Sequence, residues 1–556
     1  MKSLLQRETG GIPSASLPGE LQNACVSCFA SRAKFQVFAA FPGCVTALAL
    51  EPTRGRVLLA TDTRAVVRLF DGEARLPVEQ GGAVCGAPLA SYFNTETHSR
   101  AVTTCAWYPR DGGLFVTGGA DGAAVAWDPG LAGGGKLSPV CRVVLGGGSG
   151  SSASGSSAAS GAAGGEGRVH CVAMSPVAST HALVACGTEA PSVRLLDLAS
   201  GVAVQALPGH RDGVVACAWS PLHEHLLASG SRDGALLLHD VRRSGSLALL
   251  AAADAHATER QWLDTLAPGA AGRLAGLKLP GPSRESLGLA YRGGREGTDT
   301  AVLGNPTGDV ATTTAKAHGP GGVNGLHWAS AGVACSSGAS GGGGGGGAGR
   351  RRCDDGHLVS TGADGVARLW KVALVREGEA DDTGNLVDGV ASGAAVWNSL
   401  RDFKGIKNKA KRCIRMAMSS SCSIGSCSGS GSGSAAGRGA ATRGDRGGRS
   451  RRSRASPRGD LLFHPFTGAK AGAAAEGEAG DQASSRGAIG AWDLASGACC
   501  GVLSGGHMET VNAVEWGGYA GGTLFSGGDD GLILRWSVPS WVEAVLEVET
   551  EEEDMS

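Results

Sequence analysis

The chain has 556 residues, of which 93 are glycine, and its formal net charge is −1. A charge so close to zero gives no global preference for nucleic acid. The longest apolar run, Leu247 to Ala253, falls well short of the roughly 18 residues that span a bilayer, so we expect no membrane partner. Sixteen cysteines without a regular spacing favour a reducing compartment over a disulfide-bonded secreted fold.

The N-terminal segment, residues 1–34, precedes the repeats described below and contains two helical patterns. Residues 2–8 can form a short helix that ends at Thr9-Gly10-Gly11, and residues 20–32 can form a second helix. Their apolar side chains have no sheet of their own to pack on. Helices of this kind often dock into a groove on another protein, and a frayed terminus is the alternative.

Seven segments share a pattern of short strands that ends at a tryptophan or at a residue in its place. The clearest runs from Gly209 to Arg243: a Gly-His pair, then three strand patterns separated by Ser-Pro and Ser-Arg-Asp-Gly turns. Its turn residue Asp233 stands six positions before His239. The same spacing recurs three times, at Asp121 and Trp127, Asp364 and Trp370, and Asp530 and Trp536. Three weaker copies end at Phe70, Leu196 and Trp492. The pattern is typical of WD repeats, whose period is about 40–45 residues.

One such repeat cannot fold alone, because both faces of its small sheet need a neighbouring sheet. We therefore predict an all-β fold, a seven-bladed WD-repeat β-propeller over residues 35–541 after a short N-terminal helical segment. The run Phe35 to Phe41 is placed to complete the last blade and close the ring, and a buried linker is the alternative. Long disordered insertions are expected at about 146–167, 251–314, 331–352, 419–458 and 467–486, and an acidic disordered tail at 542–556.

His210, Ser229 and Asp233 have the residue types of a nucleophilic triad. In WD repeats the same types form a buried hydrogen-bond network with the tryptophan, and a network of this kind fixes the geometry of the blade. We adopt this structural interpretation. His507, Asp530 and Trp536 should form the network intact, whereas His239, in the tryptophan position, should alter the network of its own blade.

Other motifs do not assemble a catalytic or metal site. Cys25 and Cys28 form a lone Cys-x-x-Cys, without the two further ligands that a zinc site needs. The glycine run 341–347 lacks the Lys-Ser/Thr of a phosphate-binding loop. We therefore expect no catalytic residue, no metal, no cofactor and no enzymatic activity.

Two basic stretches, residues 404–415 and 438–458, lack the aromatic residues that single-stranded nucleic-acid platforms interleave with charge. A nuclear-import signal, a weak contact with phosphate backbones and a solvated insertion all remain open. No direct sequence-specific binding of nucleic acid is expected.

The order of the repeats, and several stretches within them, resemble the Cockayne syndrome A family of WD-repeat DNA excision-repair factors. The stretches are MKSLLQRETGG, AVTTCAWYPRDGGLFVTGGADG, VHCVAMSPVASTHALVACGTEAPSVRLLDLASG, QALPGHRDGVVACAWSP, HDVRRSG, AHGPGGVNGLHW and GHMETVNAVEW. The resemblance implies a non-catalytic substrate-recognition subunit of a cullin-four RING E3 ubiquitin ligase, acting in transcription-coupled nucleotide excision repair. It implies a nuclear protein with three partners: the damaged-DNA-binding adaptor of the ligase, a transcription-repair coupling ATPase and the stalled RNA polymerase II complex.

Carried over by position, the adaptor-binding residues are Leu4, Leu5, Arg7, Asp240 and Arg242. The family's Trp-Asp-x-Arg box falls on residues 239–242, where His239 replaces the tryptophan, which predicts a less rigid blade beneath Arg242. Two alternatives remain. One is a general WD-repeat scaffold in RNA processing or chromatin without the ligase. The other is a propeller hydrolase, which would need acids or a metal cluster converging on the central channel.

Overall fold

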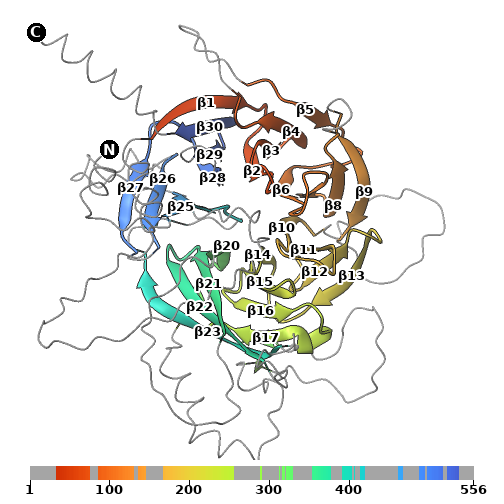
Figure 1. The fold of residues 1–556 in the computed structure, drawn as a ribbon, viewed down its shortest axis with the longest axis vertical. Coiled ribbons are helices and arrows are strands. Elements are labelled where there is room, and N and C mark those ends of the chain that lie inside the picture. The colour runs from red at the N-terminus through yellow and green to blue at the C-terminus, as the bar shows by residue number, and fades with distance from the viewer. Residues whose placement is uncertain are drawn as a thin grey trace, which may run out of the picture.

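The strands form seven four-stranded antiparallel sheets around a common axis, which confirms the predicted seven-bladed propeller (Figure 1). The computed structural model describes residues 33–74, 86–130, 136–145, 167–255, 289–290, 312–313, 316–319, 321–329, 353–376, 391–403, 406, 408, 413–419, 461–466, 487–494, 497–517 and 523–537. The N-terminal segment up to residue 32, the acidic tail and most of the expected insertions lie outside these residues.

Within a blade, consecutive strands run from the axis outward to the rim (Figure 1). Blade 1 contains β2 (Val45–Leu50), β3 (Val57–Asp62), β4 (Val66–Asp71) and β5 (Ala90–Phe93). Blade 2 contains β6 (Val102–Trp107), β7 (Phe115–Gly119), β8 (Ala123–Asp128) and β9 (Ser138–Val144). Blade 3 contains β10 (Val169–Met174), β11 (Leu183–Thr188), β12 (Val193–Asp197) and β13 (Val202–Leu207).

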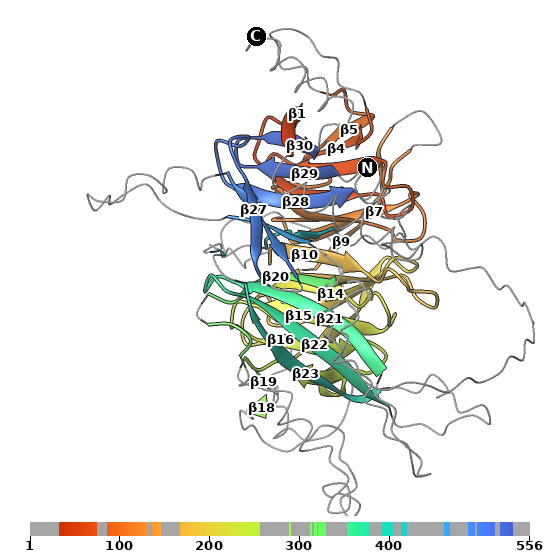
Figure 2. The same cartoon turned by 60° about the vertical axis from the view of Figure 1, so that its left-hand side comes forward.

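The second half of the ring repeats this order. Blade 4 contains β14 (Val214–Trp219), β15 (Leu226–Ser231), β16 (Leu236–Asp240) and, after the 3-10 helix η1 (Gly245–Ala248), β17 (Leu249–Ala252). Blade 5 contains β20 (Val323–Ala329), β21 (Cys353–Gly362), β22 (Ala367–Arg376) and β23 (Ala391–Asp402). Blade 6 contains β24 (Ala417–Met418), β25 (Leu461–Pro465), β26 (Ile489–Asp493) and β27 (Cys499–Leu503). Figure 2 shows these sheets from the side, with the long strands of blade 5 at the lower end.

Blade 7 closes the ring with a strand from the other end of the described chain. It contains β28 (Val511–Gly517), β29 (Thr523–Gly528), β30 (Leu532–Ser537) and β1 (Lys34–Ala40). Phe35 of β1 pairs with Trp536 of β30, and their rings lie 5.2 Å apart. The prediction of a closing strand is therefore confirmed, because β1 pairs with β30 and completes blade 7.

One expected insertion has different limits from those that the composition suggested. Ala251 and Ala252 complete β17, so the insertion predicted from residue 251 begins after the blade is finished. Within it, β18 (Leu289–Ala290) pairs with β19 (Thr312–Thr313) as a separate two-stranded sheet. The apolar run at 247–253 thus contains the end of η1 and the whole of β17. It adjoins the low-complexity segment, so composition alone misplaced the boundary.

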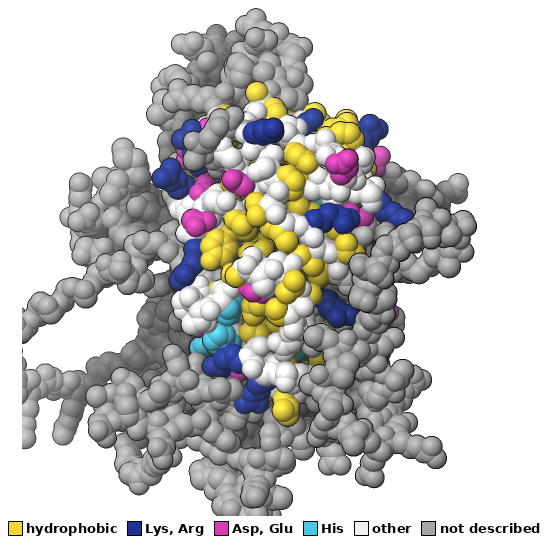
Figure 3. Space-filling model, turned by 90° about the vertical axis from the view of Figure 1, so that its right-hand side faces the viewer, with side chains coloured by type: hydrophobic (Ala, Val, Ile, Leu, Met, Phe, Trp, Pro, Cys, Tyr) yellow, Lys and Arg dark blue, Asp and Glu magenta, His cyan; other side chains and the backbone are white. Residues whose placement is uncertain are grey.

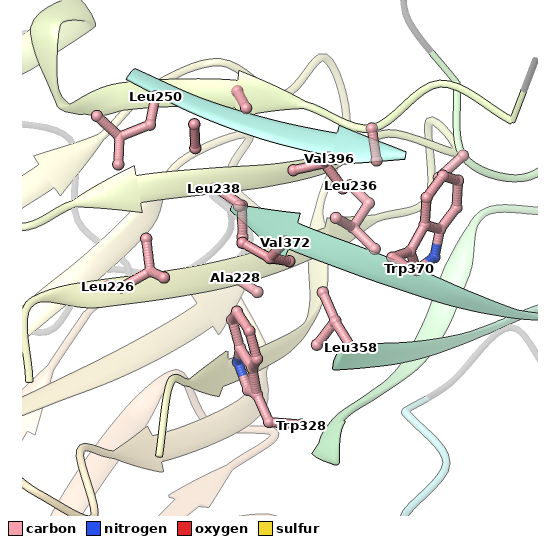
Figure 4. Packing of buried hydrophobic residues seen from close by; sticks show 14 of the residues in the cluster. Leu226, Ala228, Leu236, Leu238, Leu250, Trp328, Leu358, Trp370, Val372 and Val396 are labelled. Atoms are coloured by element: carbon pink, nitrogen blue, oxygen red, sulfur yellow. The ribbon is translucent and has the colours of Figure 1, made fainter. Parts of the chain in front are cut away.

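The hydrophobic core lies in the seams between blades, because alternate residues of each strand point to opposite faces of its sheet. Each of the seven seams contains its own cluster of buried apolar side chains. Figure 4 shows the seam between blades 4 and 5, where Leu238 of blade 4 lies close to Val372 of blade 5, and Leu236 lies near Trp370. Burying one such leucine stabilises the fold by about 1.5–3 kcal/mol. A single blade cannot gain this stabilisation, because its apolar faces are buried only against neighbouring blades.

A β-bulge interrupts the inner strand of blades 1 to 5 and 7 directly after its first residue. The extra residue turns its side chain towards the neighbouring chain segments. Thr103 Oγ1 donates to Val169 O of blade 3 at 2.5 Å, and Asn512 Nδ2 donates to Val45 O of blade 1 at 2.7 Å. These hydrogen bonds tie consecutive inner strands together at one end of the central channel.

In six blades the turn between the second and third strands has one residue in the left-handed region. Glycine supplies it in five of them, at Gly122, Gly234, Gly365, Gly487 and Gly531, with φ between 70° and 85°. Blade 1 uses Ala65 instead, with φ 63°. A Cβ is disfavoured in this conformation, so the turn of blade 1 is strained relative to the others.

Candidate docking face

Three blades contain a complete four-residue network of histidine, aspartate, hydroxyl and indole. In blade 7, His507 Nδ1 lies 2.9 Å from Asp530 Oδ2 and its Nε2 lies 2.8 Å from Ser526 Oγ, to which Trp536 Nε1 donates at 2.8 Å. The same arrangement occurs in blade 2 (His98, Asp121, Thr117, Trp127) and in blade 5 (His318, Asp364, Ser360, Trp370). Each network joins the loop before a blade to its second and third strands.

Sequence reasoning missed the histidines of blades 2 and 5. His98 follows Thr97 instead of a glycine, and the insertion at 331–352 separates His318 from Asp364. One signal could have found His98, since it precedes Asp121 by 23 residues (121 − 98), as His210 precedes Asp233 (233 − 210).

Blade 4 has a modified network, because His239 stands where the indole would be. Ser229 Oγ lies 2.8 Å from His210 Nε2 and 2.9 Å from His239 Nε2. A hydroxyl has one proton, so Ser229 donates to one ring and accepts from the other. His210 turns its Nδ1 towards Asp233 Oδ2, at 3.8 Å, which is too long for a good hydrogen bond. Ser229 therefore donates to His210 and accepts from His239 as it would from an indole.

His239 keeps the network at the expense of an unpaired atom. Its Nδ1 is buried without a hydrogen-bond partner, as is Nδ1 of His210. Complete burial and the neighbouring His210 lower the pKa of His239 to about 3, so its ring is neutral. Burial alone would raise the pKa of Asp233, but His210 and the N–H groups of Arg211 and Ala235 lower it to about 2.

The equivalent positions of blades 1, 3 and 6 cannot form the same network. Register places Ala60, Cys186 and His464 at the hydroxyl position, and the tryptophan position on the third strand is held by Phe70, Leu196 and Trp492. His464 is fully buried with both ring nitrogens unpaired, and burial lowers its pKa to about 4. The networks are therefore structural features of some blades, and the residue types vary with the packing of each seam.

The triad residue types do not form an accessible nucleophilic site. His210 is 1% exposed and Ser229 is not exposed at all. No group of three His, Cys, Asp or Glu side chains that could hold a metal ion occurs among the described residues. In the same residues, no helix is long and apolar enough to cross a membrane.

Asp240 and Arg242 form a bidentate ion pair where the third strand of blade 4 ends. Arg242 Nε donates to Asp240 Oδ1 at 3.0 Å and Nη2 donates to Oδ2 at 2.8 Å, while the Arg242 N–H also binds Oδ1 at 3.0 Å. The Asp240 side chain is 3% exposed and that of Arg242 is 33% exposed. A buried carboxylate thus fixes a cation that still reaches solvent, which suits recognition of an acidic group on a partner. The other residues predicted to bind the adaptor, Leu4, Leu5 and Arg7, lie outside the described residues.

The outer rim beside blades 2 and 3 is apolar. Val140 and Val144 of β9 and Val202 and Val204 of β13 are 44–62% exposed. Figure 3 shows apolar side chains as a band across this side of the molecule, with histidine side chains near its lower end and basic side chains scattered along it. The ring that carries Arg242 therefore also has exposed apolar side chains on its rim.

Arg415 occupies the hub of the propeller, although it belongs to the first basic stretch of the sequence. It donates to Leu48 O at 3.1 Å, to Thr104 Oγ1 at 2.7 Å and to Cys105 O, so it links blades 1 and 2. Glu515 of blade 7 faces it. Burial raises the pKa of Glu515 to about 7, although Arg415 and the Leu50 N–H act in the opposite direction. The hub is therefore occupied by an internal cation and acid.

Comparisons with known proteins agree with the fold. Residues 88–128 and 201–240 match the family model described as WD domain, G-beta repeat. The chain is 27% identical over 383 residues to the WD repeat-containing protein ATCSA-1 of Arabidopsis thaliana, covering 67% of this chain and 75% of that protein. A shorter likeness, 41% over 63 residues, is to the ribosome biogenesis protein ytm1 of Pyrenophora tritici-repentis, covering 11% of this chain and 14% of that protein. The chain is thus a WD-repeat propeller related to ATCSA-1.

Proposed function

We propose that this WD-repeat propeller is the substrate-recognition subunit of a cullin-four RING E3 ubiquitin ligase that acts in transcription-coupled nucleotide excision repair. The observation that carries the proposal is the Asp240–Arg242 pair, which fixes Arg242 at the position where the resemblance expects an adaptor-binding arginine, although His239 replaces the tryptophan. The likeness to ATCSA-1 over two thirds of the chain supports the same assignment.

In this proposal the protein contributes proximity and orientation and no bond chemistry. Arg242 and the N-terminal residues Leu4, Leu5 and Arg7 bind the damaged-DNA-binding adaptor on one face of the ring. The opposite face binds repair clients, a transcription-repair coupling ATPase and the stalled RNA polymerase II complex. A rigid disc between the two holds the client's lysines near the charged ubiquitin carrier, which converts a bimolecular encounter into an intramolecular one. The place of action is the nucleus.

The direct test is co-purification of the adaptor with the full-length protein carrying Arg242→Asp together with Leu5→Asp. Charge reversal at a partly desolvated arginine and insertion of a charge into an apolar anchor should abolish the complex. Circular dichroism should show an unchanged fold. Normal recovery of the adaptor would overturn the assignment of these residues.

Arg56→Asp provides a matched control. Arg56 binds Asp71 through Nε at 3.1 Å and Nη2 at 2.6 Å, so it repeats the Arg242–Asp240 geometry in blade 1. Asp71 follows Phe70 as Asp240 follows His239. Adaptor binding should be unchanged by the Arg56 substitution. That result would show that binding depends on the arginine of blade 4 and is not lost whenever a surface arginine is removed.

A general scaffold without the ligase would behave differently. Such a protein should retain its partners after deletion of residues 1–30, whereas the proposed receptor should lose the adaptor. Mass spectrometry of the proteins recovered with the tagged full-length and truncated chains separates the two functions.

A further inference from the structure

The loop of blade 3 that contains Ser179 and Thr180 is hydrogen-bonded to the loop of blade 4 that contains Glu224, beside the Asp240–Arg242 pair. The Glu224 carboxylate accepts four hydrogen bonds from blade 3. Ser179 donates to Oε2 through its N–H at 2.6 Å and through Oγ at 2.9 Å; Thr180 donates through its N–H to Oε2 at 3.3 Å and through Oγ1 to Oε1 at 3.1 Å. We call this arrangement of Ser179, Thr180 and Glu224 the clasp.

His181 strengthens the clasp from the same loop. Its Nε2 donates to Glu224 O at 2.9 Å, while its Nδ1 accepts from the Leu183 N–H at 3.3 Å, so both ring nitrogens have roles that fit one neutral tautomer. The ring also lies 5.4 Å from that of Trp219 at the end of β14. The whole loop of blade 4 is therefore held against blade 3.

The clasp connects to Arg242 through the backbone. The Val241 N–H donates to His225 O at 3.0 Å, so the residue after Glu224 binds the residue before Arg242. On the other side, Gln205 Nε2 of blade 3 donates to Arg243 O at 2.5 Å. The chain around Arg242 is thus held at two points, at Val241 by the blade 4 loop that the clasp fixes and at Arg243 directly by blade 3.

An acid in the equivalent region of another blade does not make such a contact. Glu51, in the turn between the first two strands of blade 1, binds Thr53 of its own turn. The clasp occurs in the blade whose network has lost its indole, where the third strand has less internal support. The arrangement therefore supports, from the neighbouring blade, the end of β16 that directly precedes Arg242.

We infer that Glu224 is a positioning residue for Arg242: through the clasp it fixes the end of β16, so that the guanidinium is presented in one place to the adaptor. This inference rests on the proposed function. A partner that meets an ordered arginine loses less conformational freedom on binding than one that must order it. Loss of the clasp should therefore weaken the complex without abolishing it.

The experiment measures the Kd and dissociation rate of the adaptor with the full-length protein, well below its unfolding midpoint. Glu224→Gln removes the charge and one acceptor oxygen, and the pair Ser179→Ala with Thr180→Val removes the two hydroxyl donors and leaves the two backbone donors. Each change weakens the clasp and should weaken binding about three- to tenfold, mainly through faster dissociation. Combining the three changes should weaken binding by less than the product of the separate effects, because they act on the same contact.

Two controls separate positioning from general damage. The single variant Thr180→Ser keeps a donor hydroxyl beside Glu224, so it should bind the adaptor with the Kd of the wild type. Glu509→Gln changes an exposed acid in the loop before blade 7, at the opposite end of the strands from the clasp, and should leave Kd unchanged. The thermal midpoint of each variant is measured alongside, so that an affinity change in a protein of unaltered stability can be recognised.

The failures are distinguishable. Wild-type affinity in Glu224→Gln, in a background where Arg242→Ala impairs binding, overturns the inference and leaves the docking site in place. Wild-type affinity in Arg242→Ala itself overturns the proposed docking site, and the inference with it. A third outcome also overturns the inference. If Glu509→Gln loses as much affinity and as much thermal stability as the clasp variants, the clasp is only a general structural contact.

Discussion

His239 donates from Nε2 to Ser229 Oγ at 2.9 Å, in the position where Trp536 donates to Ser526 at 2.8 Å. The imidazole thus repeats the hydrogen bond of the indole with a smaller ring, and it leaves Nδ1 buried and unpaired. Histidine in place of tryptophan therefore keeps the hydrogen bond to the hydroxyl, but it fills less volume and adds a buried unpaired nitrogen to blade 4.

The first prediction compares the two rings by substitution. Trp536→Phe removes a good hydrogen bond and leaves a cavity, so it should lower the free energy of unfolding by about 2 kcal/mol. His239→Phe removes a hydrogen bond but also a buried unpaired nitrogen, so its cost should stay below about 1 kcal/mol. Urea unfolding followed by circular dichroism measures both. A cost for His239→Phe as large as that for Trp536→Phe would contradict this account.

The second prediction concerns acidification. His239 has a pKa of about 3 in the folded protein and about 6.5 when unfolded, so between these values the unfolded chain binds more protons and stability rises with pH. On going from pH 7 to pH 5 the wild type should lose up to about 2 kcal/mol through this residue. His239→Phe lacks the contribution, whereas His170 and His464 titrate in both proteins. The stability gap between the two should shift in favour of the variant at pH 5, and a gap independent of pH would refute it.

The third prediction follows from the left-handed backbone of Ala65, with φ 63°. Ala65→Gly should raise the free energy of unfolding by up to about 1 kcal/mol, because relief of the Cβ strain outweighs the added flexibility of the unfolded chain. Gly365→Ala is the matched reverse change. Among the described residues, a Cβ there would meet only Ile406 O and Asn408 O, at 3.7 and 3.8 Å, which is ordinary van der Waals contact, so its cost reports mainly the backbone. Thermal unfolding of both variants checks the prediction, which fails if Ala65→Gly destabilises the protein.

The fourth prediction concerns the hub. Glu515 has a pKa of about 7 in the folded protein, above its unfolded value, so the folded state binds more protons between about pH 4.5 and 7 and loses stability as pH rises through this window. Glu515→Gln cannot ionise and should gain stability relative to the wild type between pH 5 and pH 8. Unfolding free energies at the two pH values decide the matter. The same difference at both would show that Arg415 keeps Glu515 ionised throughout.

The repeat architecture could be predicted from the sequence because its causes are local and periodic. Strand alternation, turn residues and the six-residue spacing from Asp530 to Trp536 are properties of short segments, and a sheet with two apolar faces has to be stacked. The closing strand at Phe35 followed from the same requirement. The networks of His210 and His507 could also be predicted from the sequence, since the residues of each network lie within one repeat.

Only the tertiary structure decided the contacts that cross a seam or the hub. Glu224 meets Ser179 across 45 residues, and Arg415 meets Thr104 across 311 residues. No sequence spacing encodes such pairs, because they depend on which faces the blades turn towards each other and on how far each loop reaches. The sequence by itself therefore determined the number of sheets and the order of their strands. The packing of those sheets decided which charged side chains are buried, which are paired, and how Arg242 is held at the surface, since burial and distance exist only once the ring has closed.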